Sequence, residues 1–315
     1  MSAAVRMGTR GSMLARGQSA LVAAQLERVL STRVELVEIT SAGDVTAEPL
    51  ALIGGTGVFV SALREALLDG HVDVVVHSLK DLPTWACPGV ELVAVPTRED
   101  PRDVLVSAGD LTLAQLRPGA RVGTGSPRRA AFLRAARPDI EVTELRGNVD
   151  TRLGYVAAGR LDAVVLAAAG LHRLGRAAAV SEYLEPAVML PAPGQGALAV
   201  ELAANAPAHL RAGVGLLDDV AARAEVLAER SVLAELEAGC SAPVGALARA
   251  GELSFWEPQV ELEAAVASLD GTLVLRRRTS GPVFAASELG RKLARTLLGD
   301  GAAELMAAAV AGGAR

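Results

Sequence analysis

The chain has few of the residues from which metal sites, disulfide frameworks and aromatic cores are built. Its 315 residues include two cysteines and four histidines, and aromatic residues make up only 3%. Cys87 and Cys240 form neither a disulfide framework nor a zinc-ligand pattern, and His71 and His77 lack the spacing of a metalloprotease motif. We therefore expect no metal site. Because hydrophobic residues still make up 51%, we expect a core of many small aliphatic contacts.

Long apolar runs are also missing. No uninterrupted run approaches the ~20 residues needed to cross a bilayer, and the opening residues MSAAVRMGTRGS lack the apolar stretch of a secretory signal. We therefore expect a cytoplasmic protein without a membrane partner. The net charge of −5 argues against a surface that binds nucleic acid, although it is compatible with a locally basic cleft.

Lysine is scarce among the basic residues. Of 31 lysines and arginines, only Lys80 and Lys292 are lysines. Arginine binds carboxylates and phosphates through two parallel N–H groups, which lysine does not offer. The lysine kept within HSLKDLP is therefore a candidate for a specific role.

What the chain does have is an alternation of short β-branched runs and longer amphipathic segments. This pattern predicts parallel sheets covered by helices. The predicted strands are 34–39, 72–79, 90–96, 121–126, 140–145 and 161–168. The predicted helices between them are 13–30, 58–69, 128–136 and 151–158.

Two segments rich in proline, glycine or charge, 96–103 and 190–197, look like crossovers between α/β domains. After them, a helix over 220–237 is predicted to end with Gly239 as its cap, and Asp270-Gly271 predicts a hairpin before a final helix over 285–298. The predicted domains are 1–96 with 197–214, then 102–190, both α/β, and an α+β domain over 219–315.

Polar clusters follow several predicted strands, where ligands bind in open α/β sheets. Arg10 and Ser12 follow the first strand, and GTGSPRR follows a later one. Ser126 and Pro127 suit the start of a helix, which would place Arg128 and Arg129 in its first turn beside free backbone N–H groups. Either an external anion binds there, or the helix is simply capped and its arginines are solvated.

Six arginines lie near predicted strand ends, and together they indicate a polyanionic ligand. Carboxylates are favoured over nucleotide phosphates, because neither GGTGVF nor GTGSPRR matches the phosphate-binding loop GxxxxGK[ST]. The six are Arg10, Arg128, Arg129, Arg146, Arg152 and Arg173.

Two further residues have alternative interpretations. Asp81, beside Lys80, either acts in acid–base chemistry or caps the turn before Leu82-Pro83. Cys240 has no histidine after it to serve as a base. Its residue context leaves open whether it packs in a core or attaches a group.

Nine ordered motifs carry a resemblance along almost the whole chain. They are GTRGS (8–12), GGTGVF (54–59), VVHSLKDLP (75–83), REDPRDVLVS (98–107), VGTGSPRR (122–129), ELRGNVDTRL (144–153), LAAAGLHRLG (166–175), PAPGQGAL (191–198) and ERSVLAELEAGCSAPVG (229–245). In this order they resemble the porphobilinogen deaminase, or hydroxymethylbilane synthase, family.

The resemblance implies a transferase of tetrapyrrole biosynthesis that works as a cytoplasmic monomer. The family joins four porphobilinogen molecules head to tail, with loss of ammonia, into the linear tetrapyrrole hydroxymethylbilane. Its polypyrrole chain grows on a dipyrromethane cofactor held by a cysteine thioether. The matching cysteine here is Cys240, and Asp81 matches the catalytic aspartate.

The resemblance also implies a fold and a set of binding residues. The fold is two periplasmic-binding-protein-like α/β domains plus a small α+β C-terminal domain that carries the cysteine. Cofactor or substrate binding is implied for Arg10, Ser12, Phe59, Ser78, Lys80, Thr124, Ser126, Arg128, Arg129, Arg146, Arg152, Arg173 and Gln195.

This sequence departs from the family at two places. Leu52 and Thr56 stand where many members have lysines in a glycine-rich loop, and Ala238 replaces a frequent glycine. These changes bear on substrate contacts made by the loop. A two-lobed solute- or effector-binding protein without catalysis is the alternative function. It would leave Cys240 without a role.

Overall fold

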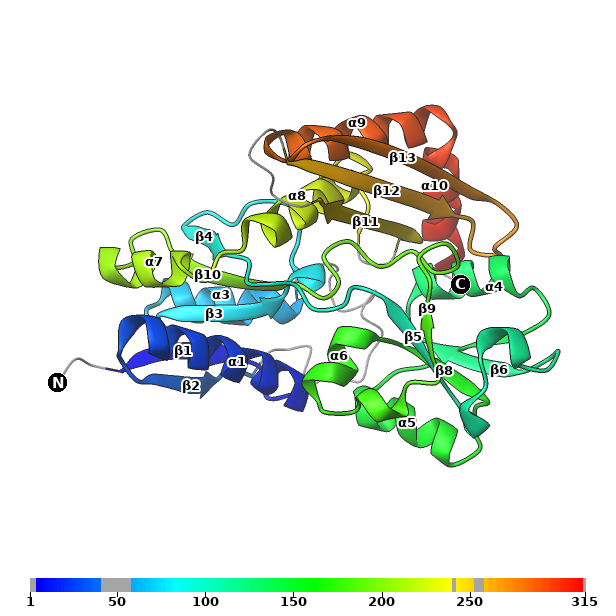
Figure 1. The fold of residues 1–315 in the computed structure, drawn as a ribbon, viewed down its shortest axis with the longest axis horizontal. Helices are drawn as coiled ribbons and strands as arrows, with labels where there is room; N and C mark the ends of the chain where they lie inside the picture. Colours follow the sequence, from blue (N-terminus) through cyan, green and yellow to red (C-terminus); the bar gives the residue numbers. More distant parts are fainter. Residues whose placement is uncertain (1–3, 41–57, 240–241, 252–257, 314–315) are drawn as a thin grey trace. The chain divides into compact units, whose positions relative to one another are not determined.

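The computed structural model describes residues 4–40, 58–239, 242–251 and 258–313 (Figure 1). The chain divides into two compact units. Unit 1 comprises Met1–Glu99 and Ala197–Arg223, and unit 2 comprises Asp100–Gly196 and Ala224–Arg315. Among the described residues, no helix has the length and apolar character that a membrane span requires.

Unit 1 contains a five-stranded sheet in the order β2-β1-β3-β10-β4. β1 is parallel to β2 and β3, whereas β10 is antiparallel to β3 and β4. The strands are β1 (Val5–Thr9), β2 (Val34–Glu38), β3 (Val74–Ser78), β4 (Val90–Ala94) and β10 (Leu198–Ala203). The helices are α1 (Met13–Leu30), α3 (Val58–Leu68) and α7 (Ala208–Gly215), with a 3-10 turn at Leu79–Asp81.

A buried ion pair joins α3 to the sheet of unit 1. Glu201 on β10 is 2% exposed, and its carboxylate binds the Arg64 guanidinium at 2.6 Å and lies 3.3 Å from Nε2 of His77. Burial alone would raise the pKa of Glu201, but the hydrogen bonds from Arg64 and the nearby His77 outweigh it and lower that pKa to about 2. The carboxylate therefore stays charged within the core of this unit.

The first sheet of unit 2 has the order β7-β6-β8-β5-β9. β6 is parallel to β7 and β8, and β5 is antiparallel to β8 and β9. The strands are β5 (Asp103–Ser107), β6 (Arg121–Thr124), β7 (Glu141–Glu144), β8 (Ala163–Ala167) and β9 (Glu182–Leu184). The helices are α4 (Pro127–Ala136), α5 (Val149–Ala157) and α6 (Ala168–Arg173), with 3-10 turns at Ala108–Asp110, Leu113–Gln115 and Ala177–Ala179.

The second sheet of unit 2 is antiparallel, in the order β11-β12-β13. Its strands are β11 (Val244–Ala250), β12 (Gln259–Ala267) and β13 (Val274–Pro282). The neighbouring helices are α8 (Val220–Glu235), which begins in unit 1, α9 (Ala286–Gly299) and α10 (Ala302–Gly313), with a 3-10 turn at Val283–Ala285. Figure 1 shows α9 lying along this sheet, and Leu293 and Val260 share one core.

The two sheets of unit 2 also share a core. Leu247 of β11 and Ala265 of β12 belong to the same buried cluster as Phe132 and Leu133 of α4. Strands β11 and β12 therefore bury residues on both faces of the sheet, one face against its own helices and one against α4.

The predicted fold class, two α/β lobes and a small α+β part, is confirmed by this topology. The predicted hairpin is confirmed too, since β12 pairs antiparallel with β13 and Gly271 has a φ of 77°. The boundaries of the three domains stay a prediction.

The predicted end of the helix before Cys240 is wrong. α8 ends at Glu235, and the left-handed residue after it is Glu237, with a φ of 51°. The Ala238 N–H donates to the Leu233 carbonyl at 3.0 Å and the Glu237 N–H to the Ala234 carbonyl at 3.1 Å, which is a Schellman ending. Gly239 does not have a positive φ, because the chain has already left the helix before it.

Candidate functional site

In unit 1, candidate residues follow two parallel neighbouring strands. Arg10 follows β1, and Ser78 closes β3 directly before the 3-10 turn that carries Lys80 and Asp81. Because parallel strands end at the same edge of a sheet, these residues belong to one edge of unit 1.

Helix α1 fixes this edge through two polar contacts. The Ser12 hydroxyl accepts a hydrogen bond from the Ala15 N–H at 3.2 Å and so caps the helix. Gln18, one turn further along, donates through Nε2 to the Ser78 hydroxyl at 3.0 Å. The start of α1 and the end of β3 are thereby held together.

Asp81 is exposed, and its carboxylate makes no hydrogen bond or ion pair with any described residue. The turn is instead closed by the backbone, since the Leu82 N–H donates to the Leu79 carbonyl. The alternative interpretation, in which the Asp81 side chain caps the turn, has no supporting hydrogen bond in the described part of the chain. The carboxylate is available to a ligand.

The structure does not describe the side chains of four residues that the sequence analysis named. Phe59 lies in α3, but its side chain is outside the described set, and Leu52, Thr56 and Cys240 are outside the described residues altogether. Their roles stay predictions.

In unit 2, the predicted cap of α4 is confirmed. The Ser126 hydroxyl accepts from the Arg129 N–H at 3.4 Å, Pro127 takes the first helical position, and the Thr124 hydroxyl accepts from the Ser126 N–H at 3.2 Å. A Cβ at Gly125 would lie 2.5 Å from the Leu145 carbonyl oxygen, so the turn into the helix needs glycine.

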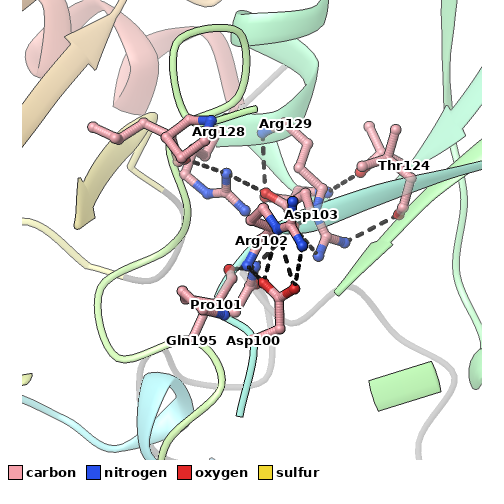
Figure 2. A network of polar contacts seen from close by, with 12 residues as sticks. Asp100, Pro101, Arg102, Asp103, Thr124, Arg128, Arg129 and Gln195 are labelled. Atoms are coloured by element: carbon pink, nitrogen blue, oxygen red, sulfur yellow. Dashed lines mark hydrogen bonds and ion pairs between the residues drawn. The ribbon is translucent and has the colours of Figure 1, made fainter. Parts of the chain in front are cut away.

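The side chains of Arg128 and Arg129 converge on one carboxylate, that of Asp103 (Figure 2). Nη1 of Arg128 lies 2.8 Å from Oδ2, and Nη2 of Arg129 lies 2.7 Å from Oδ1. Arg128 is 4% exposed, Arg129 6% and Asp103 0%. The arginines are therefore not the solvated residues of the alternative interpretation, because a buried internal carboxylate already holds them.

The electrostatics of this cluster follow from burial and proximity. Burial alone would raise the pKa of Asp103, but the charges of Arg128 and Arg129 outweigh it and hold that pKa well below its usual range. Burial lowers the pKa of Arg128, and Arg129 lowers it further, against the attraction of Asp103. Two cations thus share one anion.

Gln195 lies in the same cluster (Figure 2). Its Nε2 donates to Oδ1 of Asp103 at 2.9 Å and to the Pro101 carbonyl at 2.7 Å. The predicted binding residue Gln195 is therefore brought together with Arg128 and Arg129 through Asp103.

The remaining arginines of unit 2 have different partners. Arg146, after β7, forms an ion pair with Glu144 at 2.9 Å, and Nη2 of Arg173, at the end of α6, donates to the Gly196 carbonyl at 2.6 Å. Arg152 on α5 is partly buried and donates only through Nε, to the Gly147 carbonyl at 2.8 Å, among the described residues. Burial and the charge of Arg129 both lower the pKa of Arg152.

Unit 2 therefore has a surplus of buried and partly buried positive charge. Arg129 lies close enough to lower the pKa of both Arg128 and Arg152. Asp103 pairs with Arg128 and Arg129, and among the described residues no carboxylate pairs with Arg152. Such a cluster favours the binding of an additional anion. Within the same part of the chain, no three His, Cys, Asp or Glu side chains gather as ligands for a metal ion.

Sequence reasoning missed Asp103. A signal was present, since DVLVS begins with an acidic residue and the rest of the strand is apolar or small. A carboxylate at the start of a fully buried strand needs a cationic partner.

Two family models match the chain. "Porphobilinogen deaminase, dipyromethane cofactor binding domain" matches residues 5–211, and "Porphobilinogen deaminase, C-terminal domain" matches residues 223–299.

Curated relatives match over nearly their full lengths. "Porphobilinogen deaminase 1" of Streptomyces coelicolor is 55% identical over 311 residues, which are 96% of this chain and 97% of that protein. "Porphobilinogen deaminase" of Thermobifida fusca is 51% identical over 315 residues, covering 98% and 97%.

Among solved structures, a periplasmic substrate-binding protein of an ABC transporter from Coxiella burnetii covers 68% of this chain and 91% of its own, with a TM-score of 0.43 and 16% identity. The methionine-binding protein MetQ covers 67% and 88%, with a TM-score of 0.41 and 12% identity. Similarity at this level does not indicate a shared function.

Proposed function

The chain belongs to the porphobilinogen deaminase family, and from this premise we propose which of its residues carry the condensation of porphobilinogen into hydroxymethylbilane. The enzyme works in tetrapyrrole synthesis and has the family's dipyrromethane cofactor-binding domain. We propose in addition that it is a transferase and acts as a cytoplasmic monomer, with no nucleic acid or membrane partner.

The observation that supports the residue assignments is the surplus of buried and partly buried cations in unit 2. Each pyrrole ring of substrate, product and cofactor carries an acetate and a propionate, so a short chain of rings is a polycarboxylate. Arg128 and Arg129 share the carboxylate of Asp103, and Arg152 pairs with no carboxylate among the described residues. Guanidinium groups suit carboxylates in geometry and charge. The donors present therefore fit the cofactor.

We assign the attachment of the cofactor to Cys240 through a thioether. When bound, the cofactor supplies the pyrrole carbon to which the first substrate unit is joined. The arginines of unit 2, with Thr124, Ser126 and Gln195, hold ring carboxylates, and unit 1 contributes Arg10, Ser12, Phe59, Ser78 and Lys80 to substrate or cofactor binding.

We assign the proton transfer and charge stabilisation to Asp81. Loss of ammonia from the aminomethyl group leaves a cation on the substrate pyrrole, and a fixed carboxylate lowers the energy of such a charge. The exposed Asp81 carboxylate, which no described residue engages, is suited to hold the pyrrole N–H groups and to accept a proton.

Arg152 offers a test that separates binding from stability. Its charge is disfavoured by burial and by Arg129, so Arg152→Gln leaves the thermal midpoint Tm unchanged or slightly raised. The same change removes a donor to ring carboxylates, and KM for porphobilinogen rises about tenfold, the effect of one charge-assisted hydrogen bond. The measurements are hydroxymethylbilane formation from porphobilinogen and thermal unfolding.

The matched control is Arg6→Gln. Arg6, on β1, forms an ion pair with Asp73 at 2.6 Å. Loss of this ion pair is expected to lower Tm and to leave KM unchanged. Wild-type protein that forms no hydroxymethylbilane contradicts the function itself. A strong fall in Tm with an unchanged KM for Arg152→Gln contradicts the assigned role of this arginine.

A further inference from the structure

We propose that Asp103 is a positioning residue of the reaction, which orients Arg128 and Arg129 before any carboxylate of substrate or cofactor arrives. The inference extends the proposed function, on which it rests, to a residue within REDPRDVLVS to which the sequence analysis gave no role.

The two oxygens of Asp103 are divided among three side chains. Oδ2 accepts from Nη1 of Arg128 at 2.8 Å. Oδ1 accepts from Nε and Nη2 of Arg129 at 3.0 and 2.7 Å, and from Nε2 of Gln195 at 2.9 Å. Each guanidinium is thus fixed by a charged partner that is itself fully buried.

Backbone carbonyls complete the orientation of both arginines. Nη1 of Arg128 also donates to the Leu190 carbonyl at 2.6 Å, and Nη1 of Arg129 to the Val165 carbonyl at 3.1 Å. Nε and Nη2 of Arg128 make no bond to a described residue. These two N–H groups form the edge of a guanidinium that grips a carboxylate through two parallel bonds.

Asp103 occupies only some of the N–H groups of the two arginines. A second carboxylate, from substrate or cofactor, can therefore still bind to the others. Asp103 neutralises one of the two charges, and the cluster keeps a net positive charge for the ligand. Because the rotamers are fixed during folding, the ligand does not have to order two long side chains when it binds.

Gln195 links Asp103 to the segments of unit 2 that lie next to the two chain connections. The chain passes from unit 1 to unit 2 at Glu99 and Asp100, and returns at Gly196 and Ala197. Gln195 lies next to the second connection and bonds both Asp103 and Pro101, beside the first. One carboxylate therefore ties the arginines to both connecting segments on the side of unit 2.

The test compares Asp103→Asn with Glu201→Gln in otherwise intact holoprotein. Both substitutions remove the charge of a buried carboxylate paired with arginine, at 0% and 2% exposure. Both are expected to lower Tm. Only Asp103→Asn is expected to raise KM for porphobilinogen, by about tenfold, because two arginine side chains must then be ordered by the ligand.

Two readouts besides turnover accompany the comparison. Intact mass gives the fraction of molecules that carry the cofactor, and that fraction is expected to fall for Asp103→Asn but not for Glu201→Gln. KM and kcat are then determined per loaded molecule, so a loss of folded protein does not imitate a loss of binding.

Asp103→Glu covers the case in which the asparagine variant does not fold. It keeps the charge that both arginines require but is one methylene longer, which displaces the oxygens. We expect a Tm closer to that of the wild type than Asp103→Asn gives, and a raised KM. A wild-type KM in Asp103→Glu, or equal KM changes in Asp103→Asn and Glu201→Gln, overturns the positioning role.

Failure of this inference is distinguishable from failure of the proposed function. If wild-type protein carries the cofactor mass and makes hydroxymethylbilane while the Asp103 variants keep a normal KM, the function stands and the role of Asp103 falls. If the wild type carries no such mass and makes no product, the function fails whatever the Asp103 variants do.

Discussion

The carboxylates of Asp81 and Asp103 differ in exposure and in partners. Asp103 is fully buried and all its described partners are hydrogen-bond donors within unit 2. Asp81 is exposed, in a 3-10 turn, without a bond to a described residue. A carboxylate whose lone pairs are taken suits positioning, and one whose lone pairs are available suits contact with a reacting group.

Asp81→Asn is expected to leave Tm unchanged, because no described contact is lost. Turnover of porphobilinogen is expected to fall by about 100-fold or more, since an amide neither accepts the proton nor balances the cation. Product formation and thermal unfolding are the measurements. Asp69→Asn, an exposed aspartate of the same unit, serves as the control and keeps both properties, whereas near-normal turnover of Asp81→Asn refutes its assigned role.

At the residue scale, the sequence predicts which residues form a site better than it predicts which residues they contact. Arg128 and Arg129 were predicted to lie in the first turn of a helix, and they do. Their ion pairs with Asp103 join residues 25 and 26 positions apart. Such a pair depends on how β5 and α4 pack, which no local pattern records.

At the scale of elements, the start of α4 was predictable and the end of α8 was not. Ser126-Pro127 is a local signal, and the structure uses it as a cap. The end of α8 is set instead where the chain turns away at Glu237, two residues before the glycine that local rules favour. A glycine near a helix end is therefore no guarantee that it takes the left-handed position.

Two substitutions next to Cys240 test this helix end. Glu237→Gly removes a side chain from a left-handed residue and is expected to stabilise folding by up to ~1 kcal/mol. Gly239→Ala is expected to be neutral or slightly stabilising, because its φ is not positive and an added Cβ meets nothing within 4 Å. The free energy of unfolding by denaturant is the measurement.

The opposite pattern would contradict this description of the helix end. If Gly239→Ala destabilises the protein by ~1 kcal/mol or more while Glu237→Gly brings no gain, then Gly239 is the left-handed cap after all.

At the scale of the whole chain, the sequence predicts the two crossovers and the order of α/β and α+β parts. The units change over at Glu99/Asp100 and Gly196/Ala197, within or next to the predicted crossover segments. What the pattern does not predict is the core shared by the two sheets of unit 2, where Leu247 packs in one cluster with Phe132. β11 is buried on both faces over Val244–Leu247, and apolar residues on both faces of a strand do not reveal what covers each face.

The central claim is that this chain carries its cofactor covalently on Cys240, and the intact mass of the purified protein tests it most directly. The wild-type mass is expected to exceed the sequence mass by two linked pyrrole units. Cys240→Ser is expected to lose that excess, and Cys87→Ser, which changes the other cysteine, to keep it. Wild-type protein that has only its sequence mass and still converts porphobilinogen into hydroxymethylbilane would contradict the account.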